Sequence, residues 1–176
     1  MPHFTNHTID IQQLPKYEAT LLTKPDPKYW NIMVINLVLF LVFMGTGLTF
    51  LILVKAEIKE NWFIWTGLLL AFVAFLFLIF RLSFKRRGFA LREKDVLYKS
   101  GIIAETTTIV PLNRIQHVAL NEGFLSRMFQ LGTLQIYTAG GSSGEIRIAG
   151  IPIAQAKAMK EALIQRLAIH LETVSE

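Results

Sequence analysis

The sequence contains no cysteine, which excludes a disulfide framework, a cysteine zinc site and a cysteine nucleophile. Ionisable residues are also missing from two long stretches, 31–54 and 62–80, which contain no Asp, Glu, Lys, Arg or His. Each stretch reaches the roughly 20 mostly apolar residues that a helix needs to cross a bilayer. We therefore predict two transmembrane helices. The short external loop 55–61 can only return the chain to the side from which it came.

Two rival interpretations of the apolar stretches fit less well. A cleaved signal peptide has a shorter apolar region near the start and a small-residue cleavage site, whereas the first stretch begins only at residue 31. A buried hairpin of a soluble protein would not need the aromatic residues that flank both stretches. The flanking aromatic residues are Tyr29, Trp30, Trp62 and Trp65. Such residues are typical of a membrane–water interface.

The distribution of basic residues predicts the orientation of the hairpin. The formal net charge is +5, and seven basic residues lie near the outer ends of the two stretches. They are Lys16, Lys24, Lys28, Arg81, Lys85, Arg86 and Arg87. The connecting loop has only Lys55 and Lys59, beside Glu57 and Glu60. The positive-inside rule therefore predicts that both termini lie in the cytoplasm.

The segments outside the hairpin differ in character. Residues 1–30 are polar, contain four prolines and show no periodicity, so they are predicted to form a mostly irregular cytoplasmic arm that is partly ordered against the later domain. Residues 81–172 have the composition of an ordinary globular domain. We assign them to a second, cytoplasmic unit that follows the hairpin.

Short extended segments dominate the start of this domain. They are 88–92, 96–99, 102–111, 113–120, 133–138 and 145–148, separated by turn-like clusters. In one of them, Leu134 and Ile136 alternate with Gln135 and Tyr137, as in a strand with one buried face. Several short strands at close spacing predict a small antiparallel sandwich or barrel.

The last segment has helical periodicity. No glycine or proline follows Pro152, and apolar residues recur every three or four positions at Ile153, Ala156, Met159, Leu163, Leu167 and Leu171. This pattern predicts an amphipathic C-terminal helix with Pro152 in its first turn. Its apolar stripe is expected to pack over the open edge of the sheet.

After the two apolar stretches, four motifs occur in a distinctive order. They are Gly88-Phe-Ala-Leu-Arg92, Gly101-Ile102, Ile109-Val-Pro-Leu-Asn-Arg-Ile-Gln-His-Val118 and Leu125-Ser-Arg-Met-Phe-Gln-Leu-Gly-Thr-Leu-Gln-Ile136. Over roughly 31–167, the chain resembles the bacterial pleckstrin-homology (PH) domain membrane proteins of the YdbS-like type. The resemblance implies a bent antiparallel sandwich of about seven strands capped by a C-terminal α-helix. It also implies a location in the bacterial cytoplasmic (inner) membrane and association with other membrane proteins, often relatives with several PH-like domains. It implies neither an enzyme nor a cofactor.

One candidate site is a set of lipid headgroup contacts. The basic residues are Arg81, Lys85, Arg86, Arg87, Lys94 and Lys99. Phosphoinositide-binding PH domains of eukaryotes cluster Lys and Arg in the first hairpin, where this chain has Arg92, Lys94 and Lys99. Glu93 and Asp95 interrupt that cluster, so a solvated hairpin near an anionic leaflet is the simpler interpretation.

A second candidate lies in the family motif, at Pro111, Arg114, Gln116 and His117. A buried arginine beside a histidine could form a binding site. The alternative is structural, with Arg114 and Gln116 satisfying backbone groups or holding the loop after Pro111.

A third candidate is an apolar patch made of Phe124, Leu125, Met128 and Phe129 around Arg127. The spacing suits one or two helical turns. The patch either fills the core of the sandwich or offers a docking surface for a partner or the bilayer, and we expect two of the four apolar residues to be in the core.

Other chemistry is not expected. Of the four histidines, only His3 and His7 have a spacing that suits a metal, and this pair lies in the proline-containing arm, so no metal site is predicted. Gly140–Gly144 matches the hydrolase pattern G-x-S-x-G, but a strand follows it, so a flexible hairpin tip is the better explanation. Basic residues gather at the membrane edge rather than along a strand, which argues against nucleic acid.

Polar and small residues in the first apolar stretch are expected to pack against the second. They are Asn36, Gly45, Thr46, Gly47 and Thr49, and the alternative is an interface with another membrane protein.

Three functional hypotheses remain from the sequence. The first is a non-enzymatic, membrane-anchored interaction or scaffolding module that acts with a membrane protein partner. The second is a domain that senses anionic lipids at the inner leaflet. The third is an enzyme or an accessory subunit of a membrane transport or export assembly; the sequence shows no convergent titratable groups for catalysis. Homo-oligomerisation is left open.

Overall fold

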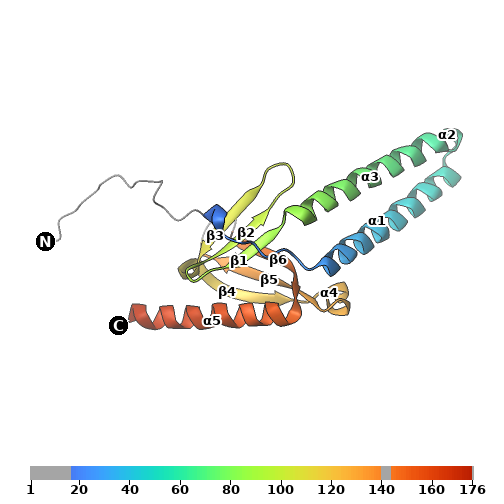
Figure 1. The fold of residues 1–176 in the computed structure, drawn as a ribbon. Helices are drawn as coiled ribbons and strands as arrows, with labels where there is room; N and C mark the ends of the chain where they lie inside the picture. Colours follow the sequence, from blue (N-terminus) through green and yellow to red (C-terminus); the bar gives the residue numbers. More distant parts are fainter. Residues whose placement is uncertain (1–16, 140–143, 176) are drawn as a thin grey trace.

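The computed structural model describes residues 17–139 and 144–175, with side chains between residues 18 and 167. Figure 1 shows two parts, a pair of long antiparallel helices and a domain of short strands with a long C-terminal helix. The combination of a transmembrane hairpin with a PH-like domain agrees with the architecture predicted from the sequence.

The hairpin consists of α1 (Pro27–Val54) and α3 (Trp62–Arg86), joined by the short helix α2 (Ala56–Glu60). Both long helices are apolar and long enough to cross a membrane, and almost none of their apolar residues are buried inside the protein. A core helix of a soluble protein would be mostly buried, so the predicted membrane hairpin is confirmed. The helices run beyond the predicted stretches, starting at Pro27 instead of residue 31 and ending at Arg86 instead of residue 80.

The two helices pack together near the domain through aromatic side chains. The ring of Trp30 lies 5.4 Å from that of Phe77 and 5.9 Å from that of Phe84. Farther from the domain, a crevice of about 920 Å³ separates the helices, lined by residues such as Phe43, Gly47 and Trp65.

The small residues of α1 were expected to pack against α3, and the crevice shows that this expectation is wrong for the two glycines. A Cβ atom added to Gly45 or Gly47 would meet no atom within 4 Å, so these residues do not pack against α3. The hydroxyl groups of Thr46 and Thr49 donate hydrogen bonds to carbonyls of their own helix, at 2.8 and 2.9 Å. Bulky aromatic contacts near the domain set the separation of the helices, and the small residues remain uncovered.

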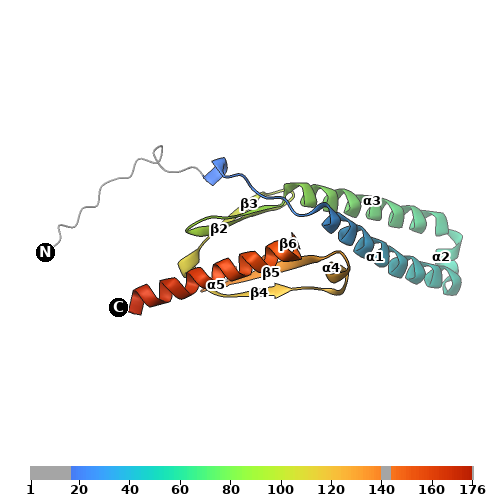
Figure 2. The same cartoon turned by 60° about the horizontal axis from the view of Figure 1, so that its bottom comes forward.

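The domain has two three-stranded antiparallel sheets. The first contains β1 (Gly88–Leu91), β2 (Asp95–Ser100) and β3 (Thr106–Pro111), and the second contains β4 (Ile115–Asn121), β5 (Leu131–Thr138) and β6 (Glu145–Pro152). Strands are adjacent in chain order in both sheets, and the 3-10 turn η3 (Leu112–Arg114) connects them. Figure 2 shows the two sheets as separate layers. The described residues thus form six strands, where about seven were expected.

The strand predictions hold where one face is buried. Leu134, Ile136 and Ile148 are buried, as their alternation predicted. The predicted strand 102–111 is wrong at its start, because β3 begins only at Thr106. Gly101 turns the chain there with a φ of 123°, and a Cβ at this position would lie 2.0 Å from the carbonyl oxygen of Ala104.

The core lies between the sheets and the C-terminal helix α5 (Ile153–Ser175). Ala156, Met159 and Leu163 of α5 are buried, which confirms the predicted stripe as far as side chains are described. The side chain of Leu171 lies outside the described set. Pro152 ends β6 and precedes the helix, so its predicted place in the first helical turn is wrong by one residue.

The end of the N-terminal arm is ordered against the domain. Thr23 forms an antiparallel bridge with Phe89 of β1, with N–H···O distances of 2.8 and 2.9 Å in the two directions. The N–H of Asp26 donates to the carbonyl of Gly150 at 2.8 Å, and its carboxylate caps α1 by accepting from the N–H of Lys28. These contacts join the start of α1 to both sheets, so the hairpin and the domain are connected at more than the end of α3.

Candidate functional site

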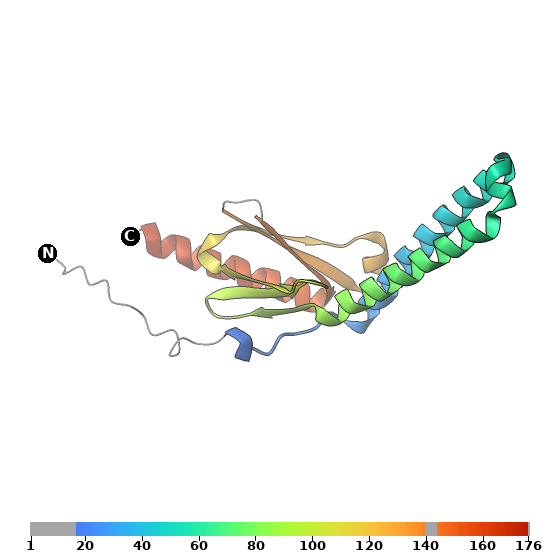
Figure 3. The same ribbon diagram turned by 90° about the horizontal axis from the view of Figure 1, so that it is seen from above.

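One end of the domain carries every connection to the hairpin. The start of α1, the end of α3, the short helix α4 (Phe124–Met128) and the start of α5 all lie there (Figures 1 and 3). We call it the membrane-facing end. The β1–β2 turn, η3 and the end of α5 lie at the opposite, distal end.

Two of the predicted headgroup residues are engaged within the protein. Arg86 donates a hydrogen bond to the carbonyl of Ile102 and lies 3.8 Å from the carboxylate of Glu105. Lys99 forms an ion pair with the same carboxylate at 2.7 Å, and this hydrogen-bonded contact lowers the pKa of Glu105 from its ordinary value. Arg86 therefore connects the end of α3 to the loop after β2, and Lys99 fixes the same loop to β2.

Arg87 and Arg81 contact the aromatic residues at the start of α1. Arg87 donates to the hydroxyl groups of Ser83 and Tyr29, both at 3.3 Å, and its guanidinium lies 5.9 Å from the Tyr29 ring. The guanidinium of Arg81 lies 4.9 Å from the ring centre of Trp30, a cation–π distance. Arg87 thus has a structural partner for its polar atoms, whereas Arg81 rests on an aromatic face.

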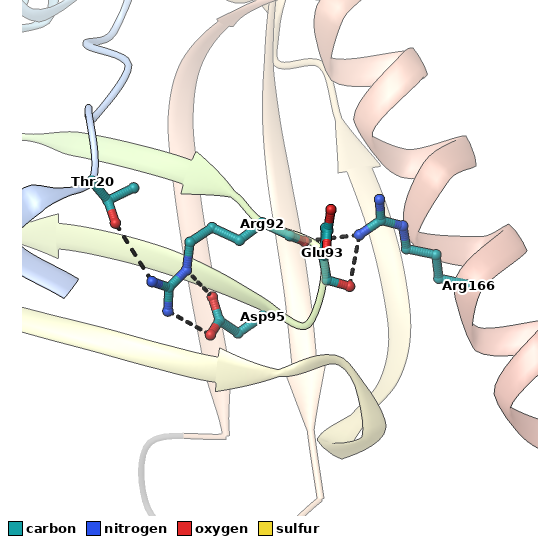
Figure 4. Close-up of polar contacts among 5 residues, drawn as sticks. All are labelled: Thr20, Arg92, Glu93, Asp95 and Arg166. Carbon is teal, nitrogen blue, oxygen red and sulfur yellow. Dashed lines mark hydrogen bonds and ion pairs between the residues drawn. The ribbon is translucent and has the colours of Figure 1, made fainter. Parts of the chain in front are cut away.

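The β1–β2 turn forms an internal polar network, shown in Figure 4. Arg92 donates two hydrogen bonds to the carboxylate of Asp95, at 2.6 and 2.5 Å, and a longer one to the hydroxyl of Thr20 at 3.5 Å. Arg166 of α5 donates to the carbonyls of Arg92 and Glu93, both at 2.8 Å. The bidentate pair with Asp95 occupies the guanidinium of Arg92, the arginine of the predicted basic cluster in the first hairpin.

Lys94 lies in this turn at the distal end, which separates it from the other five predicted headgroup residues. The sequence does not predict the hydrogen bonds of Arg166 to the turn, because the helical pattern shows only that this residue lies outside the apolar stripe. The contact depends on how α5 lies across the second sheet.

The family motif does not form a buried site. Pro111, Arg114, Gln116 and His117 are all exposed, so a buried Arg–His pair is wrong. His117 stacks on Tyr137 of β5, with ring centres 4.0 Å apart. Arg114 accepts a hydrogen bond from the N–H of Ala139 through its backbone carbonyl, at 2.9 Å. A structural role for Pro111 and for the side chains of Arg114 and Gln116 stays a prediction.

The apolar patch forms α4 and its C-terminal cap. Leu125 and Phe129 are half-buried, while Phe124 is 80% and Met128 67% exposed. Arg127 is also exposed. α4 contacts β5 and α1, at the membrane-facing end of the domain. Leu125 and Phe129 are thus covered only in part and are not members of the core, so the prediction of two core residues is not met. Phe124 and Met128 are available for an interaction.

Some sequence predictions fall on residues outside the described ranges. His3 and His7 are among them, and so are residues 140–143 of the G-x-S-x-G match. Gly144 leads directly into strand β6, whereas a hydrolase nucleophile elbow leads into a helix. Within the described residues, no group of three or more His, Asp or Glu side chains could hold a metal ion. The lack of catalysis remains a prediction.

Comparisons with known proteins agree with this architecture. Residues 32–167 match the family model described as "Bacterial PH domain". The chain is 34% identical over 71 residues to the UPF0699 transmembrane protein YdbS of Bacillus subtilis (strain 168), covering 40% of this chain and 45% of YdbS. It is 29% identical over 76 residues to the UPF0699 transmembrane protein YdbT of the same organism, covering 42% of this chain and 15% of YdbT. The matched segments thus span less than half of either relative. No solved structure matches.

Proposed function

The chain belongs to the bacterial PH domain family, and from this premise we propose that it is a membrane-anchored interaction module that works with another membrane protein. The hairpin holds the PH-like domain at the inner leaflet, with both termini in the cytoplasm. The proposed partner is a second protein of the same membrane, such as a relative with several PH-like domains. The module performs no catalysis of its own.

The exposed apolar pair on α4 carries this proposal. Phe124 and Met128 are 80% and 67% exposed, and they lie one helical turn apart on α4. Contiguous exposed apolar residues of this kind mark interaction surfaces. Because α4 lies at the membrane-facing end, a partner anchored in the same bilayer can reach it.

The crevice between α1 and α3 supports the same conclusion. Its volume of about 920 Å³ is lined mainly by apolar side chains, and the backbone near Gly45 and Gly47 is uncovered. Transmembrane helices associate through close packing at small residues, so a helix of the partner fits this face. Tethering both proteins in one membrane raises their effective concentration, and weak contacts at two places then suffice.

The double variant Phe124→Ser/Met128→Ser should weaken capture of the partner by at least about tenfold, because each truncated side chain at a buried contact costs on the order of 1 kcal/mol or more. A photoreactive amino acid at position 124 should give an adduct with a membrane protein in intact cells. Capture is measured by quantitative co-purification of that adduct protein in mild detergent.

Ile103→Ser is the matched control, because Ile103 is 99% exposed but lies outside α4. It should leave capture unchanged. Adducts that contain only lipid, or equal capture by the double variant and the control, would contradict an interaction through α4. Thermal unfolding of both variants should match the parent protein, since the replaced side chains are mostly exposed.

The proposed orientation has its own test. A reporter that is active only outside the cytoplasm, fused after Glu176, should be inactive, and one that requires the cytoplasm should be active. The reason is the excess of basic residues flanking the outer ends of the hairpin, seven against two in the loop. The opposite pattern of activities would refute the orientation.

A further inference from the structure

A cavity lies where the hairpin meets the domain. Its volume is about 550 Å³, and it is formed by the segment before α1, the end of α3 and the start of α5. Lys24, Arg81 and Lys85 contribute to its wall together with Asp26, Phe84 and Gln155. This size falls within the roughly 300–1,000 Å³ typical of small-molecule sites. The three elements meet at the membrane-facing end in all views (Figures 1, 2 and 3).

Within the part of the chain that the structure describes, the three basic residues of the cavity have no acidic partner, and Arg81 contacts the face of the Trp30 ring. Arg86 and Arg87 donate to groups of the protein, as does Arg92 in the distal turn. Among the described residues, none of the three cations in the cavity wall forms an ion pair with an acidic side chain. The carboxylate of Asp26 is engaged as the cap of α1, accepting from the N–H of Lys28 at 2.8 Å.

The start of α5 adds to the positive potential. Pro152 and Gln155 line the cavity, so the N-terminal end of this 23-residue helix borders it. The first turn of α5 contains no acidic residue. The N–H groups and the dipole at a helix N-terminus favour an anion. Three cations from two segments and one helix end therefore surround the same space.

The position of the cavity along α3 matches the depth of lipid headgroups. Arg81 follows directly on the apolar stretch 62–80, and Lys85 lies one turn farther on the same face of the helix. Trp30 and Tyr29, whose rings contact Arg81 and Arg87, are the aromatic type found at membrane–water interfaces. Phe84 supplies an apolar wall beside the cations.

We propose that this cavity binds the phosphate of an anionic phospholipid from the same leaflet, with the acyl chains lying along the hairpin. Arg81 and Lys85 contact the phosphate from α3, and Lys24 contacts it from the arm. The site is distinct from the β1–β2 turn, where Asp95 already pairs with the arginine. It is also independent of the protein partner proposed for α4.

The test uses the full chain in lipid nanodiscs made of phosphatidylcholine with a minor fraction of phosphatidylglycerol. Native mass spectrometry after release from the disc measures the lipid that stays bound. We expect one phosphatidylglycerol per chain, enriched over phosphatidylcholine. Arg81→Gln/Lys85→Gln should lower the affinity for phosphatidylglycerol about thirtyfold, measured as the rise in the phosphatidylglycerol fraction needed for half occupancy, since each cation near an anionic headgroup is worth on the order of a fivefold change in affinity.

The control removes two positive charges elsewhere. Arg114→Gln/Lys157→Gln changes exposed residues that do not line the cavity, and it should retain the bound phosphatidylglycerol. Lys24→Gln serves as a second test variant, because Lys24 precedes α1 and its loss leaves the transmembrane helices unchanged. We expect about a fivefold loss for it.

A separate arm distinguishes a lipid from a soluble phosphate. Inorganic phosphate and glycerol phosphate are titrated into the detergent-purified protein free of anionic lipid, and binding is followed calorimetrically. Weak or undetectable binding of both, with retained phosphatidylglycerol, supports a lipid site. Tight binding of either compound would assign the cavity to a soluble phosphate compound and would overturn the proposal of a lipid site. Equal retention of the two lipids, or equal retention by the cavity variant and the charge control, would also overturn it.

Discussion

Replacing Gly150 by alanine should lower the free energy of unfolding of the domain by about 3 kcal/mol, the sum of backbone strain and overpacking. Gly150 lies in β6 with a φ of 80°, where residues with a side chain are strained. An added Cβ would also lie 2.7 Å from Cγ and 2.8 Å from Cβ of Tyr29. Both effects act at the contact that joins α1 to the second sheet.

The measurement is chemical or thermal unfolding of the full chain in detergent, followed by near-UV circular dichroism. Gly123→Ala is the matched control. Gly123 has a φ of −66°, and a Cβ there would approach only the Ser126 hydroxyl, at 4.0 Å. Its effect should stay within about 1 kcal/mol. Equal destabilisation by the two substitutions would contradict a tight junction at Gly150.

A double variant tests the contact with the Tyr29 ring. Gly150→Ala should cost less stability in a Tyr29→Ala background than in the parent protein, because the ring atoms that the new methyl group meets are gone. The positive φ remains, and so does the contact with Cβ of residue 29, so the cost should fall only in part. Because the two residues are in direct contact, their effects should not be additive. Additive losses would show that the methyl group is accommodated without touching the Tyr29 ring.

This junction illustrates which features local sequence could not reveal. The absence of charge over 31–54 and 62–80 predicts helices from neighbouring residues alone, and the alternation around Leu134 does the same for β5. The contact between Tyr29 and Gly150 joins segments far apart in the chain, and the residues next to each of them form no pattern that predicts it. Glycine in β6 could equally mark a bulge or a turn.

Charge counts from sequence also gave an incomplete picture of the basic residues. The sequence predicts headgroup contacts for Arg86, Arg87 and Lys99 as well as for Arg81 and Lys85, because all are cationic and lie near the hairpin or the first turn. The structure engages the first three with protein groups, and only the direction of each side chain distinguishes them. Lys24 was counted for topology but not for a site, since its place beside α3 depends on the bridge between Thr23 and Phe89.

The second large effect is expected at Leu163 of α5. Its side chain is completely buried, and it packs in the core with residues of both sheets. Leu163→Ala should lower the free energy of unfolding by about 3 kcal/mol, because it removes buried methyl groups and leaves a cavity that the sandwich fills only partly. The same unfolding measurement applies, with hydrogen exchange of β4 and β5 amides as a local readout.

Ile164 provides a control on the same turn of the helix. It is 47% exposed, so Ile164→Ala removes a similar amount of apolar surface without opening the core. Its effect should be well under about 1 kcal/mol. The contrast between neighbours depends on burial alone, since alanine has high helix propensity at both positions. Similar losses at 163 and 164 would mean that α5 does not cover the core through the predicted stripe, and a PH-like sandwich capped by this helix would then be untenable.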